Sequence, residues 1–417
     1  MNASVIKVIY NQTNFVAKGD KIRKMRKTVL IGMVLLHTIA VAGRAGWLVG
    51  WGYDGSGQIS HLPIGDEFVA VSAGYSHNVA LWSNGRLVSW GGDSSGQVSD
   101  TPEGNEFAGV AAGDYHSVAL KTDCSLVAWG GDSHGQVSDT PSGNEFAAIA
   151  AGGYHNVALK TDGSLVAWGS DSYGQVSDTP ASNDFAAVAA GGFHNVALKT
   201  DGSLVSWGND GYGQVRGTPL GNDFAAITAG YGHSVALKTD GSLVAWGLDN
   251  QGQVSDTPAG TYFAAVAAGD KHNVALKSEG SLVSLISWGN DYSGQVSDTP
   301  SGYGFVAVAA GYAHNVAIKD PGPALSGWVW IGGGGDFGYS LVEGNSLYFF
   351  APGPLYSYNF TTGQWVTGLP MGLFYGDWPL MYEIATISLW FVLPPESGLW
   401  VYHFSTNEWE QLPQIIP

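Results

Sequence analysis

The chain has 417 residues, of which 17 are Lys or Arg and 35 are Asp or Glu, giving a formal net charge of −18. This balance argues against nucleic-acid binding, because phosphate recognition needs a positive field. The single cysteine, Cys124, excludes a disulfide scaffold and a cysteine-based zinc site. The 61 glycines and the aromatic content of 12% favour short strands joined by tight turns over helical bundles.

Residues 1–45 have the composition of an export signal. They hold eight of the 17 basic residues, and an apolar run from Thr28 to Gly43 ends in the small-residue pattern Ala40-Val41-Ala42. This combination is typical of a cleaved secretory signal, and the run is short for a membrane span of about 20 residues. We therefore expect a secreted, periplasmic or cell-surface protein with no membrane span after cleavage. A retained anchor is the alternative, and Met25 is a possible start.

A fixed period dominates the chain after residue 45. Trp-Gly pairs and histidines both recur at a spacing of 39 residues five times and then 42 residues once. The tryptophans are Trp51, Trp90, Trp129, Trp168, Trp207, Trp246 and Trp288. The histidines are His77, His116, His155, His194, His233, His272 and His314. So regular a repeat decides the architecture before local propensity does.

Each repeat predicts four short strands. In one unit these are 146–151, 156–160, 164–168 and a brief strand near 175–177, with a hairpin signal at Asp162-Gly163. No helix-length periodic segment follows residue 45. Four strands in about 40 residues are typical of a propeller blade.

The repeats predict a closed ring. Six complete units lie between residues 68 and 296, the second half of a unit precedes them at 46–59, and a first half follows at 305–319. Pairing the two halves would satisfy both open sheet edges. We therefore predict an all-β fold, with a seven-bladed β-propeller over 46–319 closed by a split blade.

The repeat also resembles a known family. The pattern that begins at Ala151-Gly152, continues through His155-Asn-Val-Ala-Leu-Lys and Trp168-Gly169, and ends in Gly174-Gln175-Val176 is similar to the regulator of chromosome condensation repeat. The resemblance covers residues 46–319 and implies a seven-bladed propeller with a shared closing blade. The compact repeat and the export signal look closer to exported bacterial members, such as the propeller-type β-lactamase-inhibitory protein, than to the nuclear exchange factor.

The recurrent histidines and tryptophans are predicted to be structural. Equivalent atoms around a ring lie far apart, whereas zinc needs ligands within about 2 Å of one point. We expect each histidine to be buried and to bond backbone between blades, and each tryptophan to pack blade on blade. The Asp-x-x-Gly turns that start at residues such as Asp171 are expected to bind backbone N–H groups rather than calcium. The prediction is therefore no metal and no cofactor.

A candidate binding surface remains when the core positions are removed. The Gly-x-x-His turns and the Asp-x-x-Gly turns are the first and third of each blade, so they share one face of the ring. The alternative is that their aromatic residues only plug the channel mouth. The candidate residues are Tyr75, Tyr115, Tyr154, Phe193, Tyr231, Lys271 and Tyr312 from the first turns, with His134, Tyr173 and Tyr212 from the third.

A different composition follows residue 319. Residues 320–324 are a predicted linker, and 325–417 contain 21 aromatic residues but no Lys or Arg. Two copies of one pattern, starting at Ser346 and Ser388, predict a small antiparallel β region.

We therefore predict an exported, monomeric, non-catalytic propeller that binds a protein partner. The sequence has no nucleophile elbow, phosphate loop, zinc-protease motif or cysteine cluster. Extracellular glycan binding or polysaccharide processing is the alternative. Guanine-nucleotide exchange is a remote one, because the signal directs the chain away from cytosolic GTPases.

Overall fold

The computed structural model describes residues 45–280 and 282–320, together with the backbone of strands between 328 and 411. The predicted export signal, the Met25 start and the predicted linker beyond Asp320 lie outside the described residues. Nothing in the described part forms a helix with the length and apolarity needed to cross a lipid bilayer.

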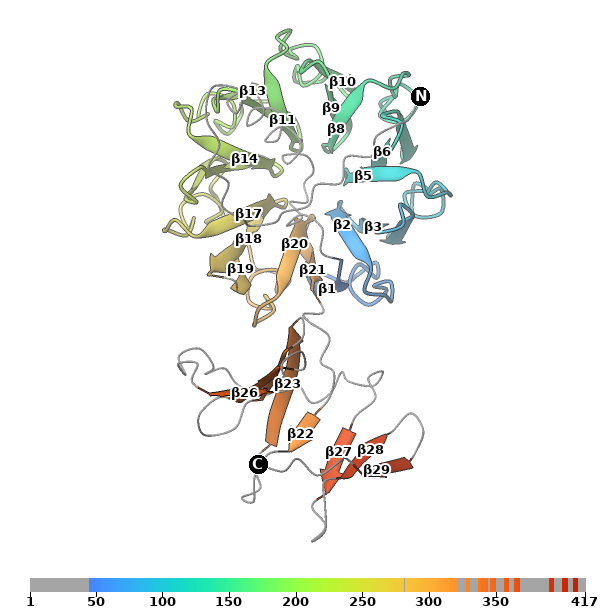
Figure 1. Cartoon of the computed structure of the whole chain (residues 1–417). Helices are drawn as coiled ribbons and strands as arrows, with labels where there is room; N and C mark the ends of the chain where they lie inside the picture. Colours follow the sequence, from blue (N-terminus) through green and yellow to red (C-terminus); the bar gives the residue numbers. More distant parts are fainter. Residues whose placement is uncertain are drawn as a thin grey trace, which may run out of the picture.

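Seven three-stranded antiparallel sheets are arranged as the blades of a ring (Figure 1). The first three blades are β2 (Phe68–Ala73), β3 (His77–Trp82), β4 (Leu87–Gly91); β5 (Phe107–Ala112), β6 (His116–Lys121), β7 (Leu126–Gly130); and β8 (Phe146–Ala151), β9 (His155–Lys160), β10 (Leu165–Gly169). The next three are β11 (Phe185–Ala190), β12 (His194–Lys199), β13 (Leu204–Gly208); β14 (Phe224–Ala229), β15 (His233–Lys238), β16 (Leu243–Gly247); and β17 (Phe263–Ala268), β18 (His272–Glu279), β19 (Leu282–Gly289).

The seventh blade confirms the predicted closure. It consists of β1 (Trp47–Gly52), β21 (His314–Lys319) and β20 (Phe305–Ala310), with β21 in the middle. Strand β1 pairs antiparallel with β21 from Trp47 opposite Lys319 to Gly52 opposite His314. The first strand of the chain therefore completes the sheet that the last repeat starts, and the split blade closes the seven-bladed propeller.

The fourth strand predicted for each blade is wrong. Residues 175–177 form a turn, in which the Asp171 Oδ1 atom accepts backbone N–H bonds from Val176 at 2.8 Å and from Ser177 at 2.9 Å. The carboxylate satisfies these donors locally, so the segment has no need of a ladder partner. Backbone hydrogen bonds from Ser99 and Val98 likewise lower the pKa of Asp93, the equivalent residue two repeats earlier.

A belt of side-chain hydrogen bonds joins each blade to the next. The His155 Nε2 atom lies 2.8 Å from Asn195 Oδ1, and the Asn195 Nδ2 group donates to the Gln175 backbone oxygen at 2.9 Å. Because that amide nitrogen is committed, its oxygen accepts and the imidazole donates. The last bond, between His314 and Asn78 at 2.8 Å, returns to the first complete blade and makes the belt circular. The expected partner was backbone, whereas the structure uses an Asn or Ser side chain.

The tryptophans form a second interblade belt. The indole N–H of Trp168 donates to the Gln136 backbone oxygen at 3.1 Å, and Trp51 of the closing blade donates to Gln295 at 3.1 Å. All seven indoles are buried, with at most 5% of each side chain exposed. Packing and one satisfied indole donor therefore act at every blade junction.

The glycine at the start of each histidine turn is required because the backbone of the next blade approaches it closely. A Cβ atom on Gly74 would lie 2.3 Å from the Gly113 backbone oxygen and 2.6 Å from its own blade's His77 ring. The same contact recurs around the ring and ends with Gly311 against the Gly74 oxygen at 2.5 Å. Any side chain there would force neighbouring blades apart.

The described backbone after residue 320 is also antiparallel. A five-stranded sheet contains β22 (Trp328–Trp330), β23 (Phe337–Glu343), β24 (Ser346–Phe349), β25 (Tyr356–Asn359) and β26 (Gln364–Thr367). A three-stranded sheet contains β27 (Trp390–Leu393), β28 (Trp400–His403) and β29 (Glu408–Gln411). The two copies of the second pattern thus form β24–β26 and β27–β29, in agreement with the predicted β region.

The hairpin at Cys124 provides a stability test. Cys124 has φ 67°, and the corresponding Gly163 has φ 87°. A left-handed conformation costs a side-chain-bearing residue about 1 kcal/mol, so Cys124→Gly should raise the free energy of unfolding by about that amount. Denaturant titration followed by circular dichroism would measure it. Gly163→Ala is the matched control and should destabilise, because its Cβ would meet the Asn183 oxygen at 2.3 Å. An unchanged or lower stability of Cys124→Gly would contradict the strain.

Candidate functional site

Two sets of turns lie on one face of the ring. The residue after each Trp-Gly pair donates its backbone N–H to the residue before a histidine, as in Ser170 to Tyr154 at 2.8 Å and Asn209 to Phe193 at 2.9 Å. The first and third turns of a blade are therefore tied together. This places all the candidate residues of the sequence analysis on the same side of the propeller, here called the aromatic face.

Four tyrosines form a continuous arc on the aromatic face. The ring centroids of Tyr312 and Tyr75 are 4.1 Å apart, those of Tyr75 and Tyr115 are 5.5 Å apart, and those of Tyr115 and Tyr154 are 5.9 Å apart. Each tyrosine comes from a different blade, and neighbouring blades supply neighbouring rings. The arc therefore crosses four blades, including the closing one.

A second, shorter arc lies on the blades that follow. Phe193 and Tyr231 have centroids 5.5 Å apart in an edge-to-face arrangement. The third turns add an outer layer, in which His134 lies 5.1 Å from Tyr154, and Tyr173 lies 5.3 Å from Phe193. The structure thus brings together eight of the ten predicted residues through aromatic contacts.

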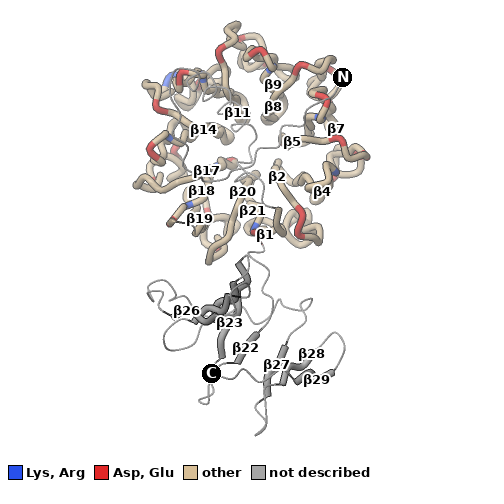
Figure 2. Tube along the Cα trace, viewed as in Figure 1, with Lys and Arg blue, Asp and Glu red and all other residues tan. Residues whose placement is uncertain are grey.

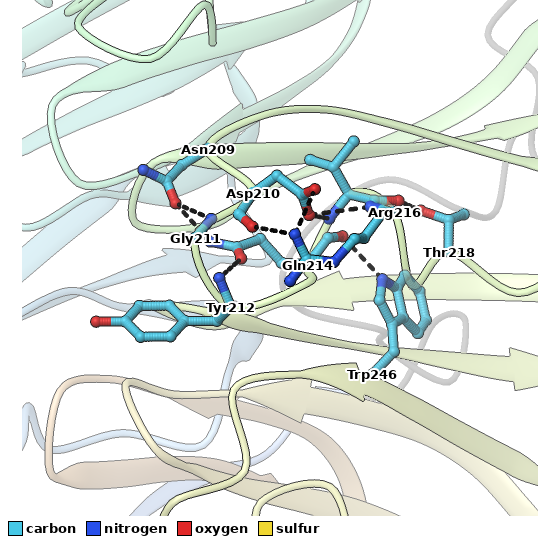
Figure 3. Close-up of polar contacts among 9 residues, drawn as sticks. Asn209, Asp210, Gly211, Tyr212, Gln214, Arg216, Thr218 and Trp246 are labelled. Carbon is cyan, nitrogen blue, oxygen red and sulfur yellow. Dashed lines mark hydrogen bonds and ion pairs between the residues drawn. The ribbon is translucent and has the colours of Figure 1, made fainter.

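The other two predicted residues are placed differently. Tyr212 is 52% exposed, and its ring points away from the polar network of its own turn (Figure 3). Lys271 occupies the first-turn position of the sixth blade and is half-buried. Three other blades have an aromatic residue at the same position, namely Tyr115, Tyr154 and Phe193. The sixth blade has no aromatic residue in its first turn, so the circle is interrupted between Tyr231 and Tyr312.

The third turns are held by a repeated polar network, shown for one blade in Figure 3. Asp210 Oδ1 accepts backbone N–H bonds from Val215 at 2.9 Å and from Arg216 at 3.0 Å. The Gln214 side chain accepts the Tyr212 N–H at 2.8 Å, and its backbone oxygen accepts the Trp246 indole at 2.9 Å. The network fixes the turn from within, which leaves the exposed Tyr212 ring free for contacts with other molecules.

Two carboxylates on this face were missed by the sequence analysis. Asp114 and Asp270 follow the close-approach glycines of their blades and are half-buried. Burial raises the pKa of Asp114 to about 6, and repulsion from Asp270 adds to the effect. Burial also raises the pKa of Asp270 to about 6, against the opposing charge of Lys271. The regular repeat predicts seven equivalent blades, whereas these two blades differ chemically from the others. The signal was present, because the residue after that glycine changes between Tyr, Gly and Asp.

Further exposed aromatic residues were also missed. Tyr53 lies in the turn after the first Trp-Gly pair and Tyr292 in the turn after the last one, and the two residues are 47% and 86% exposed. Tyr53 directly precedes Asp54 and Tyr292 directly follows Asp291, so neither is at the position two residues after the Asp that holds His134, Tyr173 and Tyr212. Searching for aromatic residues anywhere in the turn would have found them.

A shallow depression of about 320 Å³ opens beside the tyrosine arc. Its lining residues are Ser95, Tyr115, Gly131, Asp132, Ser133, Gln136 and Tyr154. Within the described residues, no group of three or more His, Cys, Asp or Glu side chains has a geometry that could hold a metal ion. The face therefore offers aromatic rings, hydroxyls and carboxylates as binding groups.

On the opposite side of the ring, lysines form ion pairs with carboxylates of the same blade. Lys160 pairs with Glu145 at 2.7 Å, and Lys238 pairs with Asp223 at 3.1 Å. The Lys238 ammonium also lies 5.6 Å from the Phe224 ring centroid. Figure 2 shows Asp and Glu on loops all around the ring, with few Lys and Arg.

The comparisons with known proteins agree with the repeat and with the fold. The regulator of chromosome condensation (RCC1) repeat matches residues 68–97, 107–136, 146–175, 185–214, 224–253 and 263–295. The chain belongs to the RCC1 repeat family. No curated protein sequence matches this RCC1-repeat chain significantly.

Solved structures similar to this RCC1-repeat propeller show the same fold. Prp20p from Saccharomyces cerevisiae, studied with its binding to Gsp1p and histones, is 18% identical with a TM-score of 0.56, over 70% of this chain and 94% of its own. Yeast RCC1 (Prp20) bound to Kap60 is 18% identical with a TM-score of 0.56, over 76% and 97%. Human WBSCR16 is 15% identical with a TM-score of 0.51, over 66% and 99%.

The buried histidines of this RCC1-repeat ring predict loss of stability in acid. Burial lowers the pKa of His155 to about 4 and that of His194 to about 3, and it also lowers the pKa of the other five repeat histidines. An unfolded histidine binds a proton near pH 6.5, so unfolding takes up protons between about pH 6.5 and 4. Stability should therefore fall as the pH is lowered through this window, by up to about 1.4 kcal/mol per pH unit for each histidine.

Thermal melts between pH 7.5 and 4.5 would measure the fall. Asp114 and Asp270 act in the opposite direction, because their raised pKa values make the folded state hold extra protons between about pH 4 and 6. The double variant Asp114→Asn/Asp270→Asn should therefore lose stability more steeply with acid than the parent. A melting temperature that stays constant or rises on acidification would contradict the neutral histidine belt.

Proposed function

We propose that this chain is an exported, non-catalytic interaction propeller that binds a protein partner through its aromatic face. One observation carries the proposal: two arcs of contacting aromatic rings, from six blades, lie on a face where the core does not need them. Tyrosines of this kind provide large, rigid contact areas at low entropic cost, and they are typical of protein interfaces.

The aromatic face is separate from the core. The blades are packed by buried residues such as Phe146, Ile149 and Trp168, each at most 4% exposed. On the aromatic face, Tyr231 is 39% exposed, Tyr312 is 42% and Tyr173 is 51%. Exposed rings that contact one another form an apolar surface, and such a surface on a water-soluble ring favours a role in recognition.

The comparison structures are consistent with a protein partner. Prp20p was described with its binding to Gsp1p and histones, and yeast RCC1 (Prp20) was solved bound to Kap60. At 18% identity the likeness establishes only the fold. It is consistent with a protein partner for this chain, and it does not assign nucleotide exchange to it.

Several features favour binding over catalysis. The seven repeat histidines have no exposed surface, so no substrate could reach them. Their Nδ1 atoms have no hydrogen-bond partner among the described residues, and they face the close-approach glycines rather than a cavity. Export is inferred from the composition of residues 1–45, which would deliver this face to the periplasm or the cell exterior.

Glycan binding is a second candidate, and the depression beside Tyr115 favours it. Two tyrosine rings could stack on a sugar, while Asp132, Ser95 and Gln136 could bind its hydroxyl groups. The depression is open and shallow, whereas the aromatic arcs extend well beyond it. The size of the whole face favours a protein.

The test is quantitative capture of partners by the immobilised full chain from an extract of the source organism's envelope and medium. The triple variant Tyr115→Ala/Tyr154→Ala/Phe193→Ala should capture at least about tenfold less of a specific partner than the parent, because anchor residues carry most of the binding energy. Its melting temperature should stay within a few degrees of the parent. A variant of exposed tyrosines elsewhere, Tyr262→Ala/Tyr303→Ala, is the control and should capture normally.

Three outcomes would count against the proposal. Capture that the triple variant leaves unchanged would mean that the aromatic face is not the binding surface. Loss of folding in the triple variant would show that these rings are part of the core. Release of the captured material by free oligosaccharides, but not by protease treatment of the extract, would favour the glycan candidate.

A further inference from the structure

We propose that the centre of the aromatic face receives a basic side chain, Lys or Arg, that a loop of the protein partner inserts between Asp114 and Asp270. This inference rests on the proposed function and specifies the chemistry of the partner. It divides the face into two parts, with aromatic arcs that bind the body of the partner and a central site that binds one positive charge.

The repeat loses its symmetry at one position of the first turns. The residue directly after the close-approach glycine differs among the blades, although the glycines and histidines on either side do not change. Only two blades place a carboxylate there, and these blades lie three steps apart around a ring of seven. The residues at this position are Tyr75, Asp114, Gly153, Gly192, Tyr231, Asp270 and Tyr312.

These turns surround one central space. The backbone of each turn bonds that of the next, as in Tyr231 N–H to the Asp270 oxygen at 3.3 Å and Tyr312 N–H to the Gly74 oxygen at 3.2 Å. The Asp114 charge acts on tyrosines of three other blades, since it helps to raise the pKa of Tyr75, Tyr154 and Tyr231. A carboxylate that acts on so many blades lies near the axis of the ring.

Glycines in neighbouring blades make room for the inward side chains. A Cβ atom on Gly153 would lie 3.1 Å from Asp114 Oδ2, and one on Gly192 would lie 2.8 Å from the Tyr231 ring. Asp114 and Tyr231 therefore lie over the backbone of the neighbouring blade, in space that a larger residue would fill.

The two carboxylates have no partner of their own among the described residues. In the part of the chain that the structure describes, neither side chain makes a hydrogen bond or an ion pair, and the lysines of the blades pair on the opposite side. Burial raises the pKa of Asp270, and the charge of neighbouring Lys271 opposes this shift without an ion pair between the two side chains. Half-buried carboxylates without a counter-ion are costly, and an incoming cation would relieve that cost.

The surrounding rings favour an organic cation over a metal ion. Tyrosine faces attract ammonium and guanidinium groups, and they add to the attraction of a nearby carboxylate. The described residues contain no cluster with the ligand number that a metal would need. The ring from 46 to 319 carries 26 acidic and nine basic residues, so a basic loop would also be attracted from a distance.

The test uses a defined probe on the full chain. N-acetyl-lysine methylamide, with its uncharged isostere N-acetyl-norleucine methylamide, is titrated while the tyrosine ring signals are followed by NMR. We expect the lysine probe to bind with a dissociation constant on the order of 1 mM and at least about tenfold more tightly than the isostere. Binding should strengthen from pH 5 to 7, because Asp114 and Asp270 become negatively charged over this range. Lys271 and the tyrosines are the other titratable groups beside them.

The variants make the test specific. Asp114→Asn/Asp270→Asn should weaken the lysine probe at least about tenfold and should fold normally, because it removes two costly charges. Asp123→Asn/Asp162→Asn changes two exposed hairpin carboxylates and should bind like the parent. Equal binding of both probes, no binding at 50 mM, or full binding by Asp114→Asn/Asp270→Asn would overturn the proposal.

Partner capture separates this inference from the function on which it rests. If Asp114→Asn/Asp270→Asn captures the partner as well as the parent does, while the aromatic triple variant does not, the central cation site is wrong and the interaction propeller stands. If neither variant affects capture, both proposals are wrong.

Discussion

The circular belt of buried hydrogen bonds between blades is the constraint on which the rest of the molecule depends. Each histidine gives its one donor to the Asn or Ser of the next blade, and the Asn amide then fixes the loop that receives the next tryptophan. A buried donor left without its acceptor costs about 1–3 kcal/mol, so no single blade can be lost without disturbing both neighbours. Because the last bond, from His314 to Asn78, returns to the start, the blades stabilise one another as a closed set.

A ring built in this way separates structure from recognition. The positions that hold the blades together face inward and repeat without change, whereas the turn positions beside them are free to vary. The two residues before the histidine are Asp114 and Tyr115 in one blade and Gly192 and Phe193 in another, although the histidine itself does not change. Because the turn residues vary while the interblade residues do not, this propeller has a face with aromatic arcs and an acidic centre.

The sequence was sufficient to predict the ring but not its centre. Spacing revealed seven blades, the split blade and the shared face of the two turns, because these follow from a period that each repeat obeys. The fourth strand near 175–177 was predicted wrongly, since propensity could not show that Asp171 would satisfy its donors. The importance of Asp114 and Asp270 was also hidden, because only the fold shows that residues from distant repeats meet near one axis. An analysis that averages repeats discards the very positions at which they differ.

The central claim of ring closure is tested most directly by a disulfide across the split blade. Val49 lies opposite Ala317 in the β1–β21 ladder, so Val49→Cys with Ala317→Cys, in a Cys124→Gly background, should form an intramolecular bond on oxidation. Peptide mapping without reduction should find residues 49 and 317 joined in the monomer. The pair Val49→Cys with Ala275→Cys, which uses the same position of the neighbouring blade, should not join. A missing bond between 49 and 317, or one formed only between molecules, would show that the ring does not close as described.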